Sequence, residues 1–545
     1  MENVPLLRIA VVLIFGIYLG ERVGGSGAVV MSFALSAFWL ILAAIIPLRK
    51  QKNIKKSGAE FFCSLCILCS VFFLGFFLVN ANRESTMSRL AALRPSSAIT
   101  ELDIHNRKGF SAYDAVIVTP LVQRGKVMKF DMMITSDEVH PFLVHASLLR
   151  DTITKNYLAL GLGAGIQACS ALKLERRQSV PTTFITPRHW KLVSPQHSRL
   201  TSLQRARLNL MMFRERLLEQ WKLTNADAES EAIVAAMALG DKGRLSRQLR
   251  DEYSISGASH VLALSGLHLG IIYFLLSFVF IRLRWQTLGQ AVVLPLIWLF
   301  ALMVGFSTSV VRAATMLSVY ALVMMLRRPS FSLNTLSLAA VVMLLVNPFN
   351  LWDIGFQLSF MAVLGILLFY RPIVRFLSVL FTRSSSSDSF AVRLFIQDDL
   401  KDIEPTHSFL NTMKKWVIGM IAVSCSAQLL TAPLVAFYFG RFSTYFLLTN
   451  LVAVPFVTLI LYCTLAFFLL SFLPSIQIVV GNVVAWFAKI LNGLVASVSS
   501  LPFSSIDGIQ LSVSQVVLIY LMLALFCFLT WILLKKLRHR VFYRS

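Results

Sequence analysis

The sequence predicts a polytopic α-helical membrane protein of about twelve spans, with a small all-β domain inserted after its first helices. Hydrophobic residues make up 57% of the 545 positions and charged residues only 14%, whereas soluble domains carry roughly 25% charged residues. The apolar residues form unbroken runs, such as 291–304, 355–370 and 513–534. Helices of about 20 residues cross about 30 Å of hydrocarbon, so these runs indicate membrane helices.

Three spans are expected near 6–19, 29–48 and 61–79. The loop between the second and third is rich in Lys and Arg, which marks it as cytoplasmic. Further spans follow the inserted region, near 261–280, 291–304, 310–325, 333–346, 355–370, 417–436, 446–472, 479–498 and 513–534. This count places both termini in the cytoplasm and the inserted region on the other side of the membrane.

The sequence between the two membrane blocks has a different pattern. Short alternating stretches such as GKVMKFDMMIT and FLVHASLL predict half-buried strands between 99 and 193, in a compact barrel or sandwich. From 202 onward the apolar period becomes helical, and the stretch with Leu208 and Met211 among arginines predicts an amphipathic helix. The expected domains are membrane helices at 1–80, a β-domain at 81–200, an amphipathic helical segment at 201–256 and a membrane core at 257–545. A flexible cytoplasmic loop is expected near 383–415.

The formal net charge is +24, and loop cations that set the topology explain part of it. Cys63, Cys66 and Cys69 repeat every three residues, but they lie inside an apolar run and no histidine completes a zinc set. Packing explains them better than a metal, because free cysteine behaves as a small hydrophobe. We therefore expect no metal and no cofactor.

Polar residues inside membrane helices are costly and are candidates for function. The segment GASHVLALSGLHLG holds His260, Ser265 and His268, with the two histidines expected on one helix face. These residues could line a polar path or pack the bundle. A Ser–His nucleophile pair is the alternative, although no orienting carboxylate occurs in this stretch.

Three further polar clusters follow along the chain. Arg312 needs an anion or a carbonyl partner if it is buried, or else extends to the interface. Asp353 is expected to cap a helix after an Asn-Pro break. The remaining polar positions in these clusters are Gln357, Ser359, Gln428, Arg441 and Asn450. Together the clusters indicate a polar pathway or a demanding bundle core.

Four stretches carry a resemblance to a known family. They are ALGDKGRLSRQLRDEYSISGASHVLALSGLHLG, GFSTSVVRA, NPFNLWDIGFQLSFMAVLGI and SAQLLTAPLVAFYFGRFSTYFLLTNLVAVP. In this order they resemble the membrane core of the ComEC family, the competence proteins that carry transforming DNA across the bacterial cytoplasmic membrane. The resemblance covers about 231–455 and adds Asp241 to the core positions. It also implies that the β-domain is OB-like.

The resemblance implies a channel for single-stranded DNA, and the absence of two motifs predicts that the chain is not an enzyme. The sequence contains no nucleotide-binding GxxxxGK[ST] motif. Many family members end in a metallo-β-lactamase-like domain, whereas this chain ends soon after its last expected span and has no HxHxDH-type cluster. A cytoplasmic ATP-driven motor, a DNA receptor and a strand-degrading nuclease would then be separate partners, beside DNA and membrane lipid. The oligomeric state stays open.

DNA as cargo would need cations on the inserted domain, where aromatic residues lie among them. Interleaved cations and rings suit single strands, because bases stack on aromatic side chains at roughly 1–3 kcal/mol each. The candidate DNA-binding residues are Arg107, Lys108, Arg124, Lys126, Lys129, Arg176, Arg177 and Arg188. An ordinary solvated basic surface is the alternative. Two other functions also remain open: transport of another anionic polymer or lipid-linked substrate, and an intramembrane enzyme using His260, Ser265 or His268.

Overall fold

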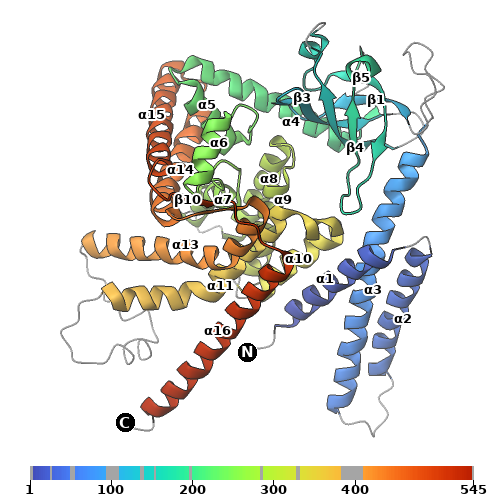
Figure 1. Cartoon of the computed structure of the whole chain (residues 1–545), viewed down its shortest axis with the longest axis vertical. Helices are drawn as coiled ribbons and strands as arrows, with labels where there is room; N and C mark the ends of the chain where they lie inside the picture. Colours follow the sequence, from blue (N-terminus) through green and yellow to red (C-terminus); the bar gives the residue numbers. More distant parts are fainter. Residues whose placement is uncertain are drawn as a thin grey trace. The chain divides into compact units, whose positions relative to one another are not determined.

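The structure is a computed structural model (Figure 1). It describes residues 4–24, 27–48, 56–93, 110–135, 140–151, 155–195, 199–282, 286–326, 332–381 and 409–542. The chain divides into two compact units. Unit 1 comprises Met1–Lys222, Leu239–Arg244 and Leu269–Asp353, and unit 2 comprises Leu223–Ala238, Leu245–His268 and Ile354–Ser545.

Unit 1 contains the N-terminal helices, a β-domain and the first part of the second membrane block. Its helices are α1 (Pro5–Val23), α2 (Ala28–Leu48), α3 (Lys56–Ala91), α4 (Ser202–Glu219), most of α7 (Gly266–Arg282), α8 (Gln286–Met303), α9 (Thr308–Met325) and α10 (Leu333–Val346). The short 3-10 helices η5 (Gln220–Leu223) and η6 (Pro348–Trp352) follow α4 and α10.

Unit 2 is almost entirely helical. Its helices are α5 (Ala228–Leu239), α6 (Arg247–Ile255), α11 (Ile354–Phe381), α13 (Phe409–Phe439), α14 (Phe446–Leu469), α15 (Pro474–Ser499) and α16 (Val513–Phe542). A two-stranded ribbon pairs β9 (Arg441–Ser443) with β10 (Ser505–Asp507) in antiparallel fashion. The expected loop near 383–415 lies mostly outside the described residues.

Each of the twelve expected membrane segments overlaps a helix. Among the described residues, eight helices are long and apolar enough to cross a membrane, and three shorter apolar helices lie at Gly266–Phe278, Gly289–Met303 and Leu333–Val346. Large apolar side chains are exposed along α2 and α16, for example Phe33 and Leu521. In a bilayer such faces meet lipid. The chain is therefore a multi-pass membrane protein, and the total of twelve crossings stays a prediction.

Several helix boundaries differ from the expected ones, and two of the differences matter for the fold. The third span was expected to end near 79, but α3 continues to Ala91, because the residues after 79 contain no Gly or Pro to stop a helix. Its last turns reach the β-domain, where Leu90 and Leu93 join the sheet's core. The fourth span was expected from 261, but α7 begins only at Gly266.

The β-domain is a curled, eight-stranded sheet (Figure 1). Its strands are β1 (Ser111–Ile117), β2 (Val122–Arg124), β3 (Val127–Ile134), β4 (Phe142–Leu149), β5 (Gly165–Ser170), β6 (Leu172–Lys173), β7 (Thr182–Ile185) and β8 (Trp190–Val193). Their order is β6-β7-β4-β3-β1-β5-β8, with β2 paired to β3. Only β4 and β7 run parallel to each other. This order confirms the all-β character but does not establish an OB-like topology.

Alternation of side chains explains how the sheet is covered on both sides. Alternate residues such as Ile117, Met132 and Val144 point inward and form its main core. On the other face, Val116 and Met133 pack against Leu208 of α4. A capping box begins α4: the side chains of Thr201 and Gln204 each accept a hydrogen bond from the other residue's backbone N–H. The amphipathic helix thus closes the outer side of β1 and β3.

Small residues let the N-terminal membrane helices approach closely. A Cβ atom at Gly16 of α1 would lie 2.1 Å from the Phe72 carbonyl oxygen of α3. Between α2 and α3, Ser36 and Ser70 each donate to the other's carbonyl oxygen at 3.0 Å. Small residues and short hydroxyls are the usual means of packing helices in lipid.

Candidate polar sites

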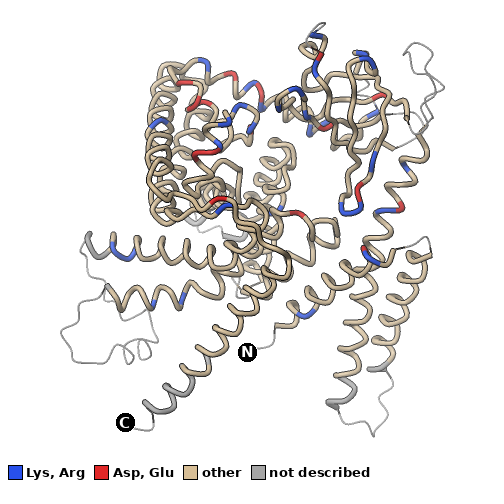
Figure 2. Tube along the Cα trace, viewed as in Figure 1, with Lys and Arg blue, Asp and Glu red and all other residues tan. Residues whose placement is uncertain are grey.

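Charged side chains are unevenly distributed in this protein. Figure 2 shows that most coloured segments lie over the β-domain, over α4 to α6 and at helix ends, while the long membrane helices are almost bare. The few polar groups inside the helical bundles are therefore the candidates for a membrane path, and the exposed cations of the β-domain are candidates for contact with an anionic polymer.

The loop ahead of α7 is the centre of the first site, in unit 2. Gly257 has a φ of +85°, and a Cβ atom there would lie 2.9 Å from Ser443 Oγ and 3.0 Å from Phe446 Cβ. The Ser256 carbonyl oxygen accepts from Thr449 Oγ1 at 2.7 Å. The loop therefore lies directly against β9 and the start of α14, which only a glycine at 257 permits.

His268 holds the start of α7. Its side chain is completely buried, and its Nδ1 accepts from the Ser265 backbone N–H at 3.1 Å. Ser265 Oγ lies 2.9 Å from the same nitrogen. Since a backbone N–H can only donate, the neutral ring carries its proton on Nε2. No described residue accepts from Nε2. The pair is thus a helix cap that leaves one buried donor facing the bundle interior.

The structure corrects the expected relation between the two histidines. They were expected on one helix face, but His260 lies in the irregular loop before Gly266 and is exposed, while His268 is buried in α7. Beside this loop, two more buried polar atoms, Ser443 Oγ and Asn450 Oδ1, have no partner among the described residues. The loop, β9 and the first turns of α14 therefore form a polar cluster with unused hydrogen-bonding capacity.

Other predicted core residues of unit 2 lie elsewhere. Gln357 of α11 accepts from Tyr438 Oη of α13 at 2.7 Å, and Ser359 donates to a carbonyl of its own helix. Gln428 is half-buried on α13. Arg441 pairs with Asp507 across the β9–β10 ribbon. The prediction that these side chains form a polar pathway or a demanding bundle core stays a prediction.

In unit 1 the buried Arg312 forms an ion pair with a carboxylate. Arg312 Nη1 lies 3.0 Å from Asp353 Oδ1, and its Nη2 donates to Ser309 Oγ at 3.3 Å. Arg312 is 7% exposed, so the arginine is buried with an anionic partner, as one of the two expectations required. Asp353 directly precedes α11, as expected for a cap, but its carboxylate is bound to the arginine. Asp241 accepts from Arg244 Nε at 3.0 Å and from the Gly243 N–H in a turn.

Sequence reasoning missed a contact made by α4. Arg207 donates to the Gly305 carbonyl oxygen at 2.6 Å, and its guanidinium lies over the Phe306 ring. Burial lowers the pKa of Arg207. Gly305 and Phe306 both have positive φ, so this turn between α8 and α9 has a special backbone shape. The partners are 98 residues apart, and no local pattern links them.

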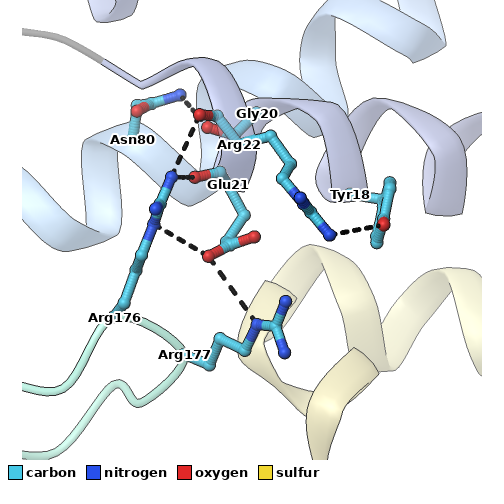
Figure 3. A network of polar contacts seen from close by, with 7 residues as sticks. All are labelled: Tyr18, Gly20, Glu21, Arg22, Asn80, Arg176 and Arg177. Carbon is cyan, nitrogen blue, oxygen red and sulfur yellow. Dashed lines mark hydrogen bonds and ion pairs between the residues drawn. The ribbon is translucent and has the colours of Figure 1, made fainter. Parts of the chain in front are cut away.

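The predicted DNA-binding cations of the β-domain fall into three groups. Arg124, Lys126 and Lys129 are exposed on the β2–β3 hairpin, and Arg188 is exposed in a 3-10 turn. Arg176 and Arg177 lie in the β6–β7 loop beside Glu21 of α1 (Figure 3). Arg107 and Lys108 lie outside the described residues.

One face of the sheet combines a cation with an exposed ring. Ser147 of β4 is paired with Lys129 of β3 on one side and with Phe184 of β7 on the other. Paired residues of neighbouring strands share a face, and Phe184 is 52% exposed. In the next row His145 Nδ1 bonds Asp131 at 2.6 Å, and this hydrogen bond raises the pKa of His145.

Comparison with known proteins gives a family for the helical part. A sequence model described as "Competence protein" matches residues 237–533. ComE operon protein 3 of Bacillus subtilis is 28% identical over 232 residues, which are 42% of this chain and 25% of the relative. Recombination protein 2 of Haemophilus influenzae is 24% identical over 251 residues, which are 44% of this chain and 29% of that protein.

An uncharacterized protein of Aquifex aeolicus is 33% identical over 156 residues, which are 28% of this chain and 37% of that protein. The matches thus cover between 25% and 37% of the relatives' own lengths. No solved structure matches the chain significantly. The family match spans more than half of the chain and includes the loop ahead of α7, the Arg312–Asp353 pair and α11 to α15. The chain belongs to the competence protein family.

Proposed function

We propose that this protein is a channel that carries single-stranded DNA across the bacterial cytoplasmic membrane during natural competence. The observation that carries the proposal is the competence family match over residues 237–533, which are mainly membrane helices. Here the β-domain lies on the non-cytoplasmic side and both termini lie in the cytoplasm. The motor and the nuclease are separate proteins, and this chain performs no catalysis.

The polar cluster of unit 2 supports a wet path. A buried polar atom left without a partner costs about 1–3 kcal/mol. His268 Nε2, Ser443 Oγ and Asn450 Oδ1 are three such atoms on adjoining elements of one unit. Water would satisfy all three atoms. The phosphates of a passing strand could accept from His268 Nε2 and Ser443 Oγ, and a route for a polyanion needs donors that bind weakly at several sites. The cluster is therefore our candidate for part of the channel wall.

The test of the function is genetic. Deleting the gene should abolish the entry of labelled DNA into the cytoplasm, while binding of DNA to the cell surface continues. Unchanged entry would reject the channel and favour another anionic cargo. The enzyme alternative rests on the 2.9 Å Ser265–His268 contact. It would gain support if His268→Ala removed a hydrolytic activity and left DNA entry intact.

The hairpin cations should contribute to DNA binding through phosphate contacts. We expect Lys126→Gln/Lys129→Gln to weaken binding of an oligothymidylate to the purified full-length protein. The slope of log affinity against log salt should fall by about 1.4, since each phosphate contact on a single strand contributes about 0.7. Fluorescence anisotropy over a salt series measures both quantities.

A matched control removes two exposed cations elsewhere in the same unit. Arg216 and Lys222 are exposed at the end of α4 and just beyond it, so Arg216→Gln/Lys222→Gln changes the net charge equally. The control should keep the wild-type slope. Equal slopes in all three proteins would mean that the hairpin does not contact the strand.

The His145–Asp131 pair should make the β-domain's stability depend on pH. The bond to Asp131 raises the pKa of His145 above its ordinary value of about 6.5. The resulting stabilisation is therefore full below about pH 6.5 and is lost as the pH rises through the folded-state value. His145 is 48% exposed, so the contribution should stay below about 1 kcal/mol.

Thermal unfolding between about pH 5.5 and 8.5 checks this dependence. The difference between wild type and His145→Gln should be largest at the acid end and should vanish at the alkaline end. His140 is exposed in the same domain, and His140→Gln should follow the wild-type curve. A difference that grows with pH would contradict the assignment.

A further inference from the structure

Three arginines and one carboxylate, that of Glu21, lie at the C-terminal end of α1, and two of the arginines pair with the carboxylate (Figure 3). Glu21 is 3% exposed, and its Oε1 lies 2.9 Å from Arg176 Nε and 3.7 Å from Arg177 Nε. Arg176 also donates to the carbonyl oxygens of Glu21 and Arg22 at 2.7 and 3.0 Å. The β6–β7 loop of the β-domain is thus fastened to the end of a membrane helix.

The cluster carries a net positive charge. Arg176 and Arg177 face the Glu21 carboxylate, and the Arg22 guanidinium lies beside Tyr18. Three positive charges minus one negative charge leave two. The guanidinium of Arg176 already donates to Glu21 and to two backbone carbonyl oxygens. Arg177 stands farther from Glu21, its side chain is half-exposed, and its guanidinium lies 5.9 Å from the Trp352 ring centroid. Arg22 is exposed and donates to Tyr18 Oη at 3.0 Å. Both Arg22 and Arg177 can therefore take an anion.

The cluster lies where membrane helices end. Asn80, near the end of the most apolar part of α3, donates to the Gly20 carbonyl oxygen of α1. Trp352 closes η6, directly after α10. Tyr18 and Trp352 are aromatic residues of the kind that line the boundary between lipid and water. These positions place the arginines at headgroup level.

An apolar stripe leads along α1 to the same point. Leu7, Val11, Phe15 and Tyr18 are 39%, 56%, 58% and 39% exposed. Their spacings of four, four and three residues put them on one face of the helix, and Arg22 follows four residues later. An acyl chain that lies along this stripe would cover the four apolar side chains, and its headgroup would lie beside the arginines.

We propose that Arg22 and Arg177, beside the Glu21–Arg176 pair, bind the phosphate of an anionic phospholipid whose acyl chain lies along the α1 stripe. Guanidinium groups bind phosphate through charge-assisted hydrogen bonds, and basic pockets at helix ends hold anionic headgroups. A DNA phosphate could contact the same cations, but DNA carries no acyl chain that would cover the apolar stripe. A bound headgroup joins α1 to the β6–β7 loop, so anionic lipid holds the β-domain on the N-terminal helices.

Native mass spectrometry of the full chain with added phosphatidylglycerol or phosphatidylcholine tests the proposal. The wild type should prefer phosphatidylglycerol. Arg22→Gln/Arg177→Gln should lose about thirty-fold in phosphatidylglycerol affinity, about fivefold for each arginine, with no change for phosphatidylcholine. Arg176 is left in place so that Glu21 keeps its partner. Arg216→Gln/Lys222→Gln removes the same charge elsewhere and should retain the preference.

Further measurements separate the site from a folding defect and from other phosphates. Arg22→Lys/Arg177→Lys should keep most of the preference, and thermal unfolding should show that the glutamine variant is folded. The proposal is overturned if the glutamine variant keeps the preference, or if equimolar inorganic phosphate displaces the lipid. It is also overturned if that variant loses oligothymidylate binding but not phosphatidylglycerol binding, which would assign the cluster to DNA. None of the lipid measurements depends on the proposed DNA channel.

Discussion

Asp353→Asn is expected to lower the free energy of unfolding by about 3 kcal/mol, because it removes the charge that faces a buried guanidinium. Arg312 is 7% exposed and its Nη1 lies 3.0 Å from Asp353 Oδ1. The aspartate side chain is 35% exposed, so Arg312→Leu should cost less, since water can solvate the remaining carboxylate. Chemical unfolding in detergent measures both changes.

The double variant decides whether the pair itself is responsible. Arg312→Leu/Asp353→Asn should recover more than half of the loss seen in Asp353→Asn, since no uncompensated charge remains. The Arg441–Asp507 pair on the β9–β10 ribbon provides the control, because the Asp507 side chain is 55% exposed. Asp507→Asn should cost less than about 1 kcal/mol. If the single effects of Arg312→Leu and Asp353→Asn simply add, the two side chains are not energetically coupled.

Gly257→Ala should destabilise unit 2 by about 2–5 kcal/mol, because two costs combine. A residue with a Cβ atom loses roughly 1–2 kcal/mol in the left-handed conformation, which the φ of +85° imposes. Crowding in a packed interior adds roughly 1–3 kcal/mol, since the new Cβ would lie 2.9 Å from Ser443 Oγ. Thermal unfolding and DNA entry should both decline.

Gly270→Ala is the matched control for this change. Gly270 lies in α7, thirteen residues further along the same family motif, and a Cβ atom there meets nothing within 4 Å. Alanine favours a helix over glycine by about 1 kcal/mol, so this variant should be as stable as wild type or more so. Equal losses from the two substitutions would show that the loop ahead of α7 is not held as described.

Local pattern was enough to predict most of the helices and several strands. The apolar run at 333–346 matches α10, and the alternation of FLVHASLL matches β4. In these segments the residues themselves carry the periodicity. The irregular loop before Gly266 could not be predicted, because its buried apolar residues Val261, Leu262 and Leu264 follow neither a helical nor a strand period.

The candidate sites were predictable as residues but not as contacts. The sequence singled out Arg312 and Asp353 separately, but their pairing joins positions 41 residues apart. Arg176 was expected to bind DNA, and no contact was predicted for Glu21 near the end of α1. Their contact bridges 155 residues. An acidic residue at the end of an apolar helix was the available signal, since such a charge needs a cation when it is buried.

The division into units has a consequence for how the protein is made. The chain passes between the units after Lys222, Ala238, Arg244, His268 and Asp353. Segments of unit 2 that are synthesised early therefore pack against segments that are synthesised much later. Tyr253 of α6 bonds Asn492 of α15 at 3.0 Å, 239 residues further on. At about 5–20 residues per second, a ribosome needs about 10–50 s to supply that partner. During this interval α6 and the loop ahead of α7 lack their final neighbours, so Tyr253 and the buried residues of this loop stay uncovered until α14 and α15 have been made.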